Sequence, residues 1–243
     1  MADTPARLRL EDLQLAQGSR TVLQHIDGEF RDGAITALIG ANGTGKSTLI
    51  QGIMGMLKPI AGRVDCRVPK ERRAWLPQQL ALDLTFPMSV EELVMTGSWP
   101  SHGALKGYCA AHYRRGREIM ARLGISHLSH RPLGELSGGQ RQRALLGRTL
   151  MQEAALLLLD EPFANVDAET VDVLMTVLRD MANDGATIIV VLHDMEQLSR
   201  LADEAVVLAG GHARWVPVES FQQPGGNLPA PFLGHAITGV SAC

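Results

Sequence analysis

The sequence predicts an α/β fold, in which a helical lobe is inserted into a core of parallel strands. Two continuous apolar runs, at 156–159 and 187–192, are typical of strands buried on both faces of a parallel sheet. Between them an apolar stripe at helical spacing extends from 171 to 181. Residues 80–135 contain three prolines and no apolar strand, while 90–94 and 119–123 carry helical stripes. The order strand, helix, strand therefore indicates the core, and 80–135 indicates the inserted lobe.

The composition is that of a folded chain with no strong preference for nucleic acid. Of the 243 residues, 45% are hydrophobic and 20% are charged, which excludes intrinsic disorder. The net charge of −3 argues against a dedicated nucleic-acid binder, because such proteins usually carry a strongly basic face. No apolar run approaches the roughly 20 residues that cross a bilayer, and the N-terminus lacks the pattern of a signal peptide. We therefore expect the chain to stay in the cytoplasm, so that any role at a membrane would come through a partner.

Cysteine and histidine do not predict a metal centre. The three cysteines are scattered, which suits reduced thiols better than a disulfide framework or a tetrahedral metal site. Four of the eight histidines lie in or near the predicted lobe, but their spacing is irregular and no cysteine pair accompanies them. We therefore expect these side chains to bind neither a structural metal nor any other metal ion. These histidines are His102, His112, His127 and His130.

The first 60 residues predict strand, turn, strand and helix in that order. Apolar and polar residues alternate through most of 7–15, as in a half-buried strand, and 17–20 reads as a turn. Residues 35–39 form a short apolar strand that runs into Gly40. A helix begins near Thr48 and is expected to end near Lys58, because a proline follows.

Residues 40–47 match the phosphate-binding pattern G-x-x-x-x-G-K-[ST] in the required context, with an apolar strand before and a helix after. Glycines let backbone N–H groups curl around a polyphosphate, and the helix directs its positive end at the same anion. Lys46 can reach the terminal phosphates, and the Ser47 hydroxyl can hold Mg²⁺. The residues predicted to bind the nucleotide, which is ATP if the family resemblance described below holds, are Gly40, Asn42, Gly43, Thr44, Gly45, Lys46, Ser47 and Thr48.

The apolar strand at 156–159 ends in two carboxylates, Asp160 and Glu161. A strand-end Asp of this kind binds the Mg²⁺ shell in P-loop NTPases. Glu161 lies where the chain leaves the sheet, so it could polarise an attacking water as general base. The alternative is that one carboxylate caps the turn at Pro162. That alternative is stronger for Glu161 than for Asp160.

A phosphate-binding loop occurs in several kinds of nucleotide-binding protein, and the pentapeptide Leu-Ser-Gly-Gly-Gln at 136–140 helps to distinguish among them. Ser137 can cap a helix whose first turn bares the N–H groups of Gly138 and Gly139, which favours an anion there. The string, with Gln140, resembles the signature sequence of ABC-type ATPases without a mismatch. In that family two ATPase domains pair head to tail, and the signature of one faces the γ-phosphate bound to the other. The resemblance thus implies an ATP-dependent homodimer.

Three further residues take roles from the same resemblance, which covers about 8–211. Gln78 follows Trp-Leu-Pro and matches the Gln that reaches Mg²⁺ and the attacking water, although a surface loop residue is the alternative. Asp167 matches the Asp that contacts the partner copy, and a lone Asp here can also cap a helix. His193 matches the switch His that senses the γ-phosphate. The implied catalytic residues are Glu161, His193 and Gln78, and the implied Mg²⁺ ligands are Ser47, Gln78 and Asp160.

The resemblance also implies the fold and the domain plan. It predicts a P-loop NTPase (RecA-like) core with an N-terminal antiparallel β subdomain and an inserted α-helical subdomain. We expect the ATPase domain to span 1–215, the helical subdomain to occupy about 80–150, and 216–243 to be a loosely ordered tail rich in Gly and Pro.

One position departs from the family pattern. An aromatic residue that stacks on adenine is usual near 17–18, but Gln17 and Gly18 stand there. Such stacking is worth on the order of 1 kcal/mol or more. We therefore expect weaker or less selective base binding, or an adenine held by Val22 and aliphatic stems.

The cargo is indicated only by graded similarity. Residues 82–94 and 160–167 resemble the matching stretches of ATPases that serve zinc, manganese or iron importers. The favoured function is an ATP-hydrolysing importer subunit that uses ATP and Mg²⁺ and works with a membrane permease, and with a solute-binding protein, on the inner face of the plasma membrane. The alternatives are transport of a siderophore or another small solute, a non-transport ABC ATPase in cofactor assembly or DNA maintenance, and a P-loop kinase or simple nucleotide-binding module.

Overall fold

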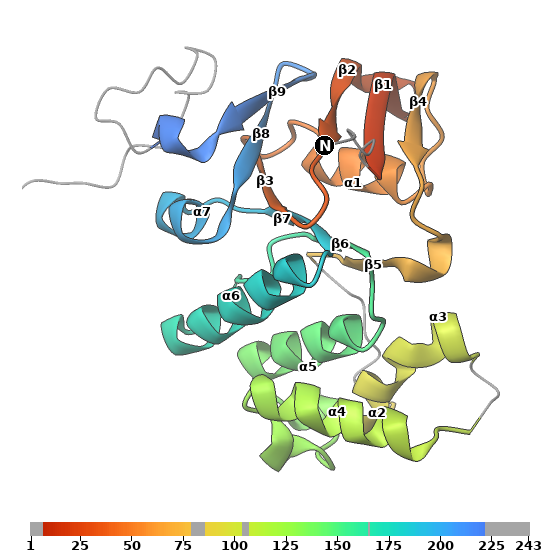
Figure 1. The fold of residues 1–243 in the computed structure, drawn as a ribbon, viewed down its shortest axis with the longest axis vertical. Coiled ribbons are helices and arrows are strands. Elements are labelled where there is room, and N and C mark those ends of the chain that lie inside the picture. Colours follow the sequence, from red (N-terminus) through yellow and green to blue (C-terminus); the bar gives the residue numbers. More distant parts are fainter. Residues whose placement is uncertain (1–6, 79–85, 104–106, 165, 222–243) are drawn as a thin grey trace, which may run out of the picture. The chain divides into compact units, whose positions relative to one another are not determined.

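The computed structural model describes residues 7–78, 86–103, 107–164 and 166–221. The chain divides into two compact units, and each is described by itself. The first unit comprises Met1–Arg67 and Ile189–Cys243, and the second comprises Val68–Ile188. The boundary falls inside one strand, β7 (Thr187–Val191) (Figure 1).

A three-stranded antiparallel sheet begins the first unit, in the order β2 (Arg20–Phe30), β1 (Leu8–Gln17) and β4 (Ala61–Cys66). The alternation predicted for 7–15 is real, because every second or third side chain of β1 is buried, the leucines in particular. Burying one face of a half-polar sheet is what fixes the register of its strands.

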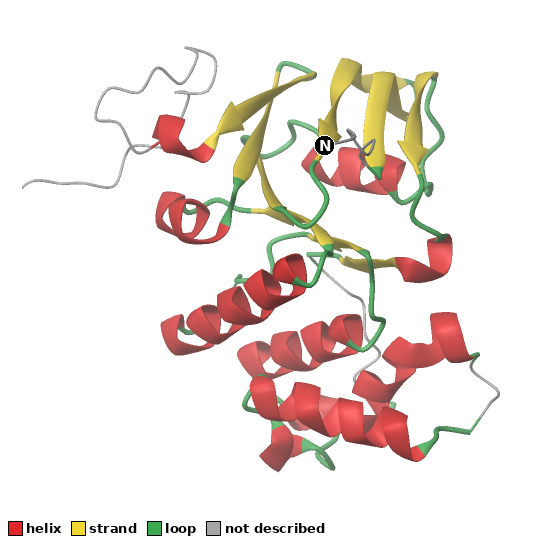
Figure 2. Ribbon diagram, in the orientation of Figure 1, coloured by secondary structure: helices red, strands yellow, loops and turns green. Residues whose placement is uncertain are grey.

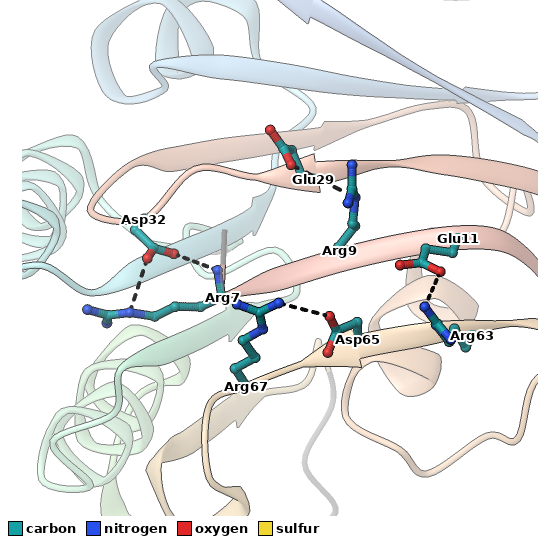
Figure 3. Close-up of polar contacts among 8 residues, drawn as sticks. All are labelled: Arg7, Arg9, Glu11, Glu29, Asp32, Arg63, Asp65 and Arg67. Atoms are coloured by element: carbon teal, nitrogen blue, oxygen red, sulfur yellow. Dashed lines mark hydrogen bonds and ion pairs between the residues drawn. The ribbon is translucent and has the colours of Figure 1, made fainter. Parts of the chain in front are cut away.

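Charged side chains from these strands and the adjoining residues pair across and beside the sheet (Figure 3). Arg9 lies opposite Glu29 on one neighbouring strand and opposite Asp65 on the other. Exposed pairs of this kind stabilise a fold by at most about 1 kcal/mol each, so they chiefly favour the correct pairing of the strands. The pairs are Arg7–Asp32 at 3.1 Å, Arg9–Glu29 at 4.0 Å, Arg63–Glu11 at 2.6 Å and Arg67–Asp65 at 3.7 Å.

The rest of the first unit, among its described residues, has parallel and antiparallel strands and two α-helices. β3 (Ile35–Ile39) has the predicted bounds and runs parallel to β8 (Glu204–Ala209). β8 in turn pairs antiparallel with β9 (His212–Pro217). The two helices are α1 (Lys46–Ile53) and α7 (Met195–Leu201).

The predicted end of α1 near Lys58 is wrong. The helix ends at Ile53, and Gly55 follows the cap residue with φ +75°. A glycine in the left-handed conformation just past the last turn is a common helix stop, and here it acts before Pro59 can.

The second unit combines a parallel strand pair with the helical lobe (Figure 2). β5 (Arg73–Leu76) runs parallel to β6 (Leu156–Leu159), whose four leucines are fully buried as predicted. Among the described residues between 86 and 135, the only strand-like pairing is an isolated bridge between Ser89 and Pro132, so the expected helical lobe is present. The α-helices are α2 (Val90–Met95), α3 (Trp99–His102), α4 (Ala110–Arg122), α5 (Gly138–Leu150) and α6 (Ala168–Asn183).

Two local features shape the lobe. Helix α5 packs against α2 and α4, and a Cβ at Gly97 would overlap the Arg148 carbonyl oxygen, so glycine allows this close approach. Cys109 caps α4, and the backbone N–H of His112 holds the pKa of that thiol below its usual value. A donor at a helix N-terminus favours the thiolate over the thiol.

Regular structure continues past the predicted start of the tail at 216. β9 extends to Pro217, and Val218 in the following 3-10 helix (Val218–Phe221) is only 4% exposed. Packing of this side chain explains why the order reaches further than composition indicated. The remainder of the predicted tail, 222–243, lies outside the described residues.

The described residues contain neither a membrane-spanning helix nor a cluster of metal ligands. None of their helices has the length and apolar character that a bilayer crossing requires. Within the same residues, no three His, Cys, Asp or Glu side chains are grouped so as to hold a metal ion.

Candidate functional site

The loop at 40–47 joins β3 to α1 in the first unit, which is the predicted strand-loop-helix context. A Cβ at Gly40 would lie 2.6 Å from the Leu208 carbonyl oxygen. Gly45 has φ +102°, and a Cβ there would lie 2.8 Å from Leu23 and Val22 side-chain carbons. Only glycine fits these two positions, so the loop can bring its backbone N–H groups close to a ligand.

Lys46 is folded back over this loop. Its side chain is 7% exposed, and its Nζ donates to the carbonyl oxygens of Gly40 at 2.8 Å and Ala41 at 3.1 Å. The loop thus holds an ammonium group at the positive end of α1, where an anion is favoured. The next residue, Ser47, is exposed, and its hydroxyl is an oxygen donor of the type that Mg²⁺ prefers.

Of the other predicted loop residues, Asn42 and Gly43 are exposed. Thr44 donates its Oγ1 hydrogen to the Ala41 carbonyl oxygen at 2.9 Å, which closes the turn. Thr48 is buried.

Gln17 contacts this region from the end of β1. Its Nε2 donates to the Thr48 Oγ1 at 3.1 Å, so the residue that replaces the expected aromatic is tied to α1. Val22 lies beside Gly45, as the contact of an added Cβ shows. A polar amide and an aliphatic side chain therefore stand where a stacking ring was expected.

Asp160 follows β6 in the second unit and is 4% exposed. Its backbone N–H donates to the Leu76 carbonyl oxygen at 2.8 Å, so the pairing of β5 and β6 continues up to this carboxylate. A buried carboxylate at the end of a strand is a suitable anionic ligand for a divalent cation.

Glu161 and Gln78 are brought together in the second unit. The Gln78 Nε2 donates to the Glu161 Oε2 at 2.6 Å. Glu161 has φ +54°, which is uncommon for a residue other than glycine, and its carbonyl oxygen accepts from the Ala164 N–H at 3.2 Å. The carbonyl, rather than the carboxylate, makes this turn contact, so the side chain is left to pair with Gln78. Two of the three predicted catalytic side chains thus share one hydrogen bond.

The predicted signature forms the start of α5. The Ser137 Oγ accepts from the Gln140 N–H at 3.3 Å, and the Gln140 Oε1 accepts from the Ser137 N–H at 3.1 Å, which makes a capping box. A Cβ added to Gly138 would meet nothing within 4 Å, and Gly139 is partly exposed. The first turn of this 13-residue helix is therefore open to a ligand.

Asp167 is the N-cap of α6. Its Oδ1 accepts from the Thr170 N–H at 2.9 Å and its Oδ2 from the Thr170 hydroxyl at 2.8 Å. The backbone bond in particular holds the pKa of Asp167 below its usual value. The predicted capping role is confirmed, whereas contact with a partner copy stays a prediction. Asn165, in the same segment, lies outside the described residues.

His193 follows β7 in the first unit and is exposed. The next residue, Asp194, caps α7 by accepting from the N–H groups of Glu196 at 2.7 Å and Gln197 at 3.3 Å. His193 and the phosphate loop thus belong to one unit, while Gln78, Glu161 and the signature belong to the other.

Sequence reasoning missed one residue of this constellation. Gln142, on α5, donates from its Nε2 to the Pro162 carbonyl oxygen at 3.3 Å. The sequence offers no signal for this contact, because nothing in a helical pattern indicates which polar side chain reaches a distant turn.

A phosphate loop between a strand and a helix, a strand ending in Asp-Glu, and a capped signature helix define a nucleotide-hydrolysing P-loop ATPase. The chain belongs to the ABC transporter family, whose model matches residues 23–164. It binds ATP and hydrolyses it to power transport, as the subunit of a complex that includes membrane permease components.

Known proteins resemble this chain over most of its length. The zinc transport system ATP-binding protein TroB of Treponema pallidum is 39% identical over 212 residues, which cover 84% of this chain and 79% of that protein. The manganese transport system ATP-binding protein MntA of Synechocystis is 38% identical over 197 residues, which cover 78% of this chain and 76% of that protein.

A solved structure supports the fold class. That of cbiO1 from Clostridium perfringens, part of the ABC transporter complex cbiONQ, is 28% identical and covers 90% of this chain and 92% of that one, with a TM-score of 0.76. The predicted mixed α/β fold of the P-loop ATPases is confirmed.

Proposed function

We propose that this chain is the ATPase subunit of a metal-ion importer, with zinc or manganese as the cargo. The names of the relatives support the cargo, because TroB is a zinc system protein and MntA a manganese system protein. The hydrogen bond between Gln78 and Glu161 carries the catalytic part of the proposal. It places an amide and a carboxylate at one point beside the buried Asp160.

In the proposed mechanism, the residues of the site bind the phosphates, position the attacking water and accept its proton. The loop N–H groups and Lys46 bind the β- and γ-phosphates, and Gln78 orients the attacking water. Glu161 accepts a proton from that water as general base. His193 donates a hydrogen bond to the γ-phosphate and so distinguishes ATP from ADP.

The donor set fits Mg²⁺. A Ser47 hydroxyl, a Gln78 amide oxygen and an Asp160 carboxylate are hard oxygen ligands, which this cation prefers over nitrogen or sulfur. When bound, Mg²⁺ neutralises charge on the phosphates. The three side chains would hold it, and Asp160 would supply the negative charge.

Completion of the site requires a second copy. The open first turn of α5, with Ser137, Gly138, Gly139 and Gln140, suits the γ-phosphate of a nucleotide bound to the other protomer. Asp167 lies at the start of α6, where it can contact that protomer. ATP then forms part of the interface, and hydrolysis lets the two copies separate.

The motion is passed to a permease through the helical lobe. The chain thus acts at the cytoplasmic face of the plasma membrane, and a solute-binding protein delivers the metal on the other side. Exposed apolar side chains of the lobe, Phe86 at 58% and Trp99 at 41%, are suitable contacts for that partner.

The catalytic proposal is tested with Glu161→Gln. This variant should bind Mg-ATP and dimerise, but hydrolyse ATP at least about a hundredfold more slowly, because general-base catalysis typically contributes 10²–10⁴-fold. Normal turnover would refute the assignment of Glu161.

The cargo is tested separately in cells that lack the gene. Uptake of labelled zinc and manganese should fall in the deletion strain and recover with the wild-type gene but not with Glu161→Gln. Normal uptake of both metals together with loss of siderophore or other solute uptake would favour the alternative cargo. Intact transport with loss of a cofactor would favour a role in cofactor assembly.

A further inference from the structure

Helix α5 connects the signature to the turn that carries the catalytic carboxylate. Its first residues form the open anion site, and Gln142, one turn further on, reaches the turn at 161–164. The Gln142 Nε2 donates to the Pro162 carbonyl oxygen at 3.3 Å, and the side chain is partly buried. A single side chain therefore joins the helix to the residue directly after Glu161.

The turn itself is held in an unfavourable conformation. Glu161 has φ +54°, and such strain persists only where the surroundings fix the backbone. Two other contacts help to fix it. The Asp160 N–H donates to the Leu76 carbonyl oxygen at 2.8 Å, and the Gln78 Nε2 donates to the Glu161 Oε2 at 2.6 Å. These two contacts come from the strand side, whereas Gln142 comes from the signature helix.

The helix is held at its start and along its body. The Ser137–Gln140 capping box defines its start, and its body packs against α2 and α4. Arg141 donates to the Leu136 carbonyl oxygen at 3.1 Å, and Arg143 to the Leu123 carbonyl oxygen at 3.5 Å, so the residues on both sides of Gln142 are also anchored. Movement of the first turn toward an anion would then move the Gln142 amide with it.

We propose that Gln142 is a positioning residue, which couples the signature helix to the Glu161 turn of the same protomer through its hydrogen bond to the Pro162 carbonyl. In a head-to-tail dimer the signature senses the partner's nucleotide, so this bond links the occupancy of one site to the catalytic geometry of the other. The inference rests on the proposed function of Glu161 as general base. It adds a residue that acts through the Pro162 carbonyl.

The test compares three variants of the full-length chain in Mg-ATP hydrolysis. Gln142→Met keeps the shape but removes the donor, and should lower kcat about fivefold while leaving the KM for ATP within about twofold. Gln142→Lys retains a donor of similar reach and should keep at least about half of the wild-type kcat. Gln152→Met makes the same change in the turn after α5 and should leave both constants unchanged.

A second readout does not depend on turnover. The Ala164 N–H donates to the Glu161 carbonyl at 3.2 Å, and its hydrogen exchange reports opening of this turn. In Gln142→Met this amide should exchange about fivefold faster than in wild type, while amides in β6 keep their protection. An unchanged kcat and unchanged exchange at Ala164, equal to those of Gln152→Met, would overturn the inference.

The experiments distinguish failure of the catalytic role of Glu161 from failure of the positioning role of Gln142. If the wild type hydrolyses no ATP, or Glu161→Gln hydrolyses it normally, the proposed catalytic role fails, while the exchange measurement still tests the Gln142 contact. If Glu161→Gln is inactive and Gln142→Met is indistinguishable from wild type, only the role of Gln142 is refuted.

Discussion

The conformation of Glu161 predicts an unusual order of stability among its variants. At φ +54° an L-residue pays about 1–2 kcal/mol that glycine does not pay. Glu161→Ala and Glu161→Gly both lose the hydrogen bond from Gln78, so that loss cancels when the two are compared. The glycine variant should be the more stable of the two by about 1 kcal/mol after its larger unfolded-state entropy is subtracted.

The size of the effect is measurable by thermal unfolding without nucleotide. For a chain of this length, about 1 kcal/mol corresponds to roughly 2–4 °C in Tm. Glu161→Gly should therefore melt about 2–4 °C above Glu161→Ala, although neither variant should hydrolyse ATP. Glu118, which lies inside α4, provides the matched control. There glycine should be less stable than alanine by about 1 kcal/mol.

If the Tm of Glu161→Ala equalled or exceeded that of Glu161→Gly, the reasoning would be refuted, because the backbone would then carry no strain at this position. The predicted order would support the view that Glu161 is held in its strained turn for catalysis at a cost in stability.

Three further predictions concern other parts of the chain. Gln17→Tyr supplies a stacking ring and should raise the preference for ATP over GTP about fivefold or more, measured by competition binding; unchanged selectivity would count against the base-site interpretation. When the other two cysteines are replaced by serine, the alkylation rate of Cys109 should reach half of its maximum at a lower pH in the folded chain than in urea, because a backbone N–H favours the thiolate. Equal pH midpoints in the two states would contradict this. Gly97→Ala should lower the free energy of unfolding in urea by about 1–3 kcal/mol, because its Cβ meets the Arg148 carbonyl. Gly107→Ala, with open space around it, should be nearly neutral, and equal losses at both glycines would show that crowding is not the cause.

The elements with a strong local pattern were predictable from the sequence. The strand at 35–39 and the strand at 156–159 have the predicted bounds, because a buried apolar run leaves little choice of structure. The phosphate loop follows from its glycines, and the cap at Ser137 follows from a serine before the first turn of a helix, whereas the reciprocal bond from Gln140 is seen only in the structure.

The boundaries were harder to predict, since competing local signals decide them. Pro59 indicated a helix end near Lys58, but Gly55 ends the helix earlier by adopting a left-handed conformation. The tail was expected to begin at 216 on composition, whereas pairing of β9 and burial of Val218 extend the order. The pairing of β9 and the burial of Val218 are tertiary effects, which a local window of sequence does not show.

The contacts at the candidate site depend on tertiary structure. Gln78 and Glu161 are 83 residues apart, and they meet because β5 and β6 pair in parallel and end at the same edge. The resemblance assigned both residues to the same water, but it did not supply their hydrogen bond. Gln142 left no signal at all, because its role depends on where α5 passes the turn after Glu161.

The central claim is that ATP is clamped between two copies of this chain, with the signature of each completing the site of the other. It is tested most directly by the solution mass of Glu161→Gln, measured by light scattering with and without Mg-ATP. The 26.3 kDa chain should double in mass only with ATP, and a second substitution, Ser137→Arg, should keep it monomeric while ATP still binds. A dimer that forms without ATP, or one that survives Ser137→Arg, would contradict the claim.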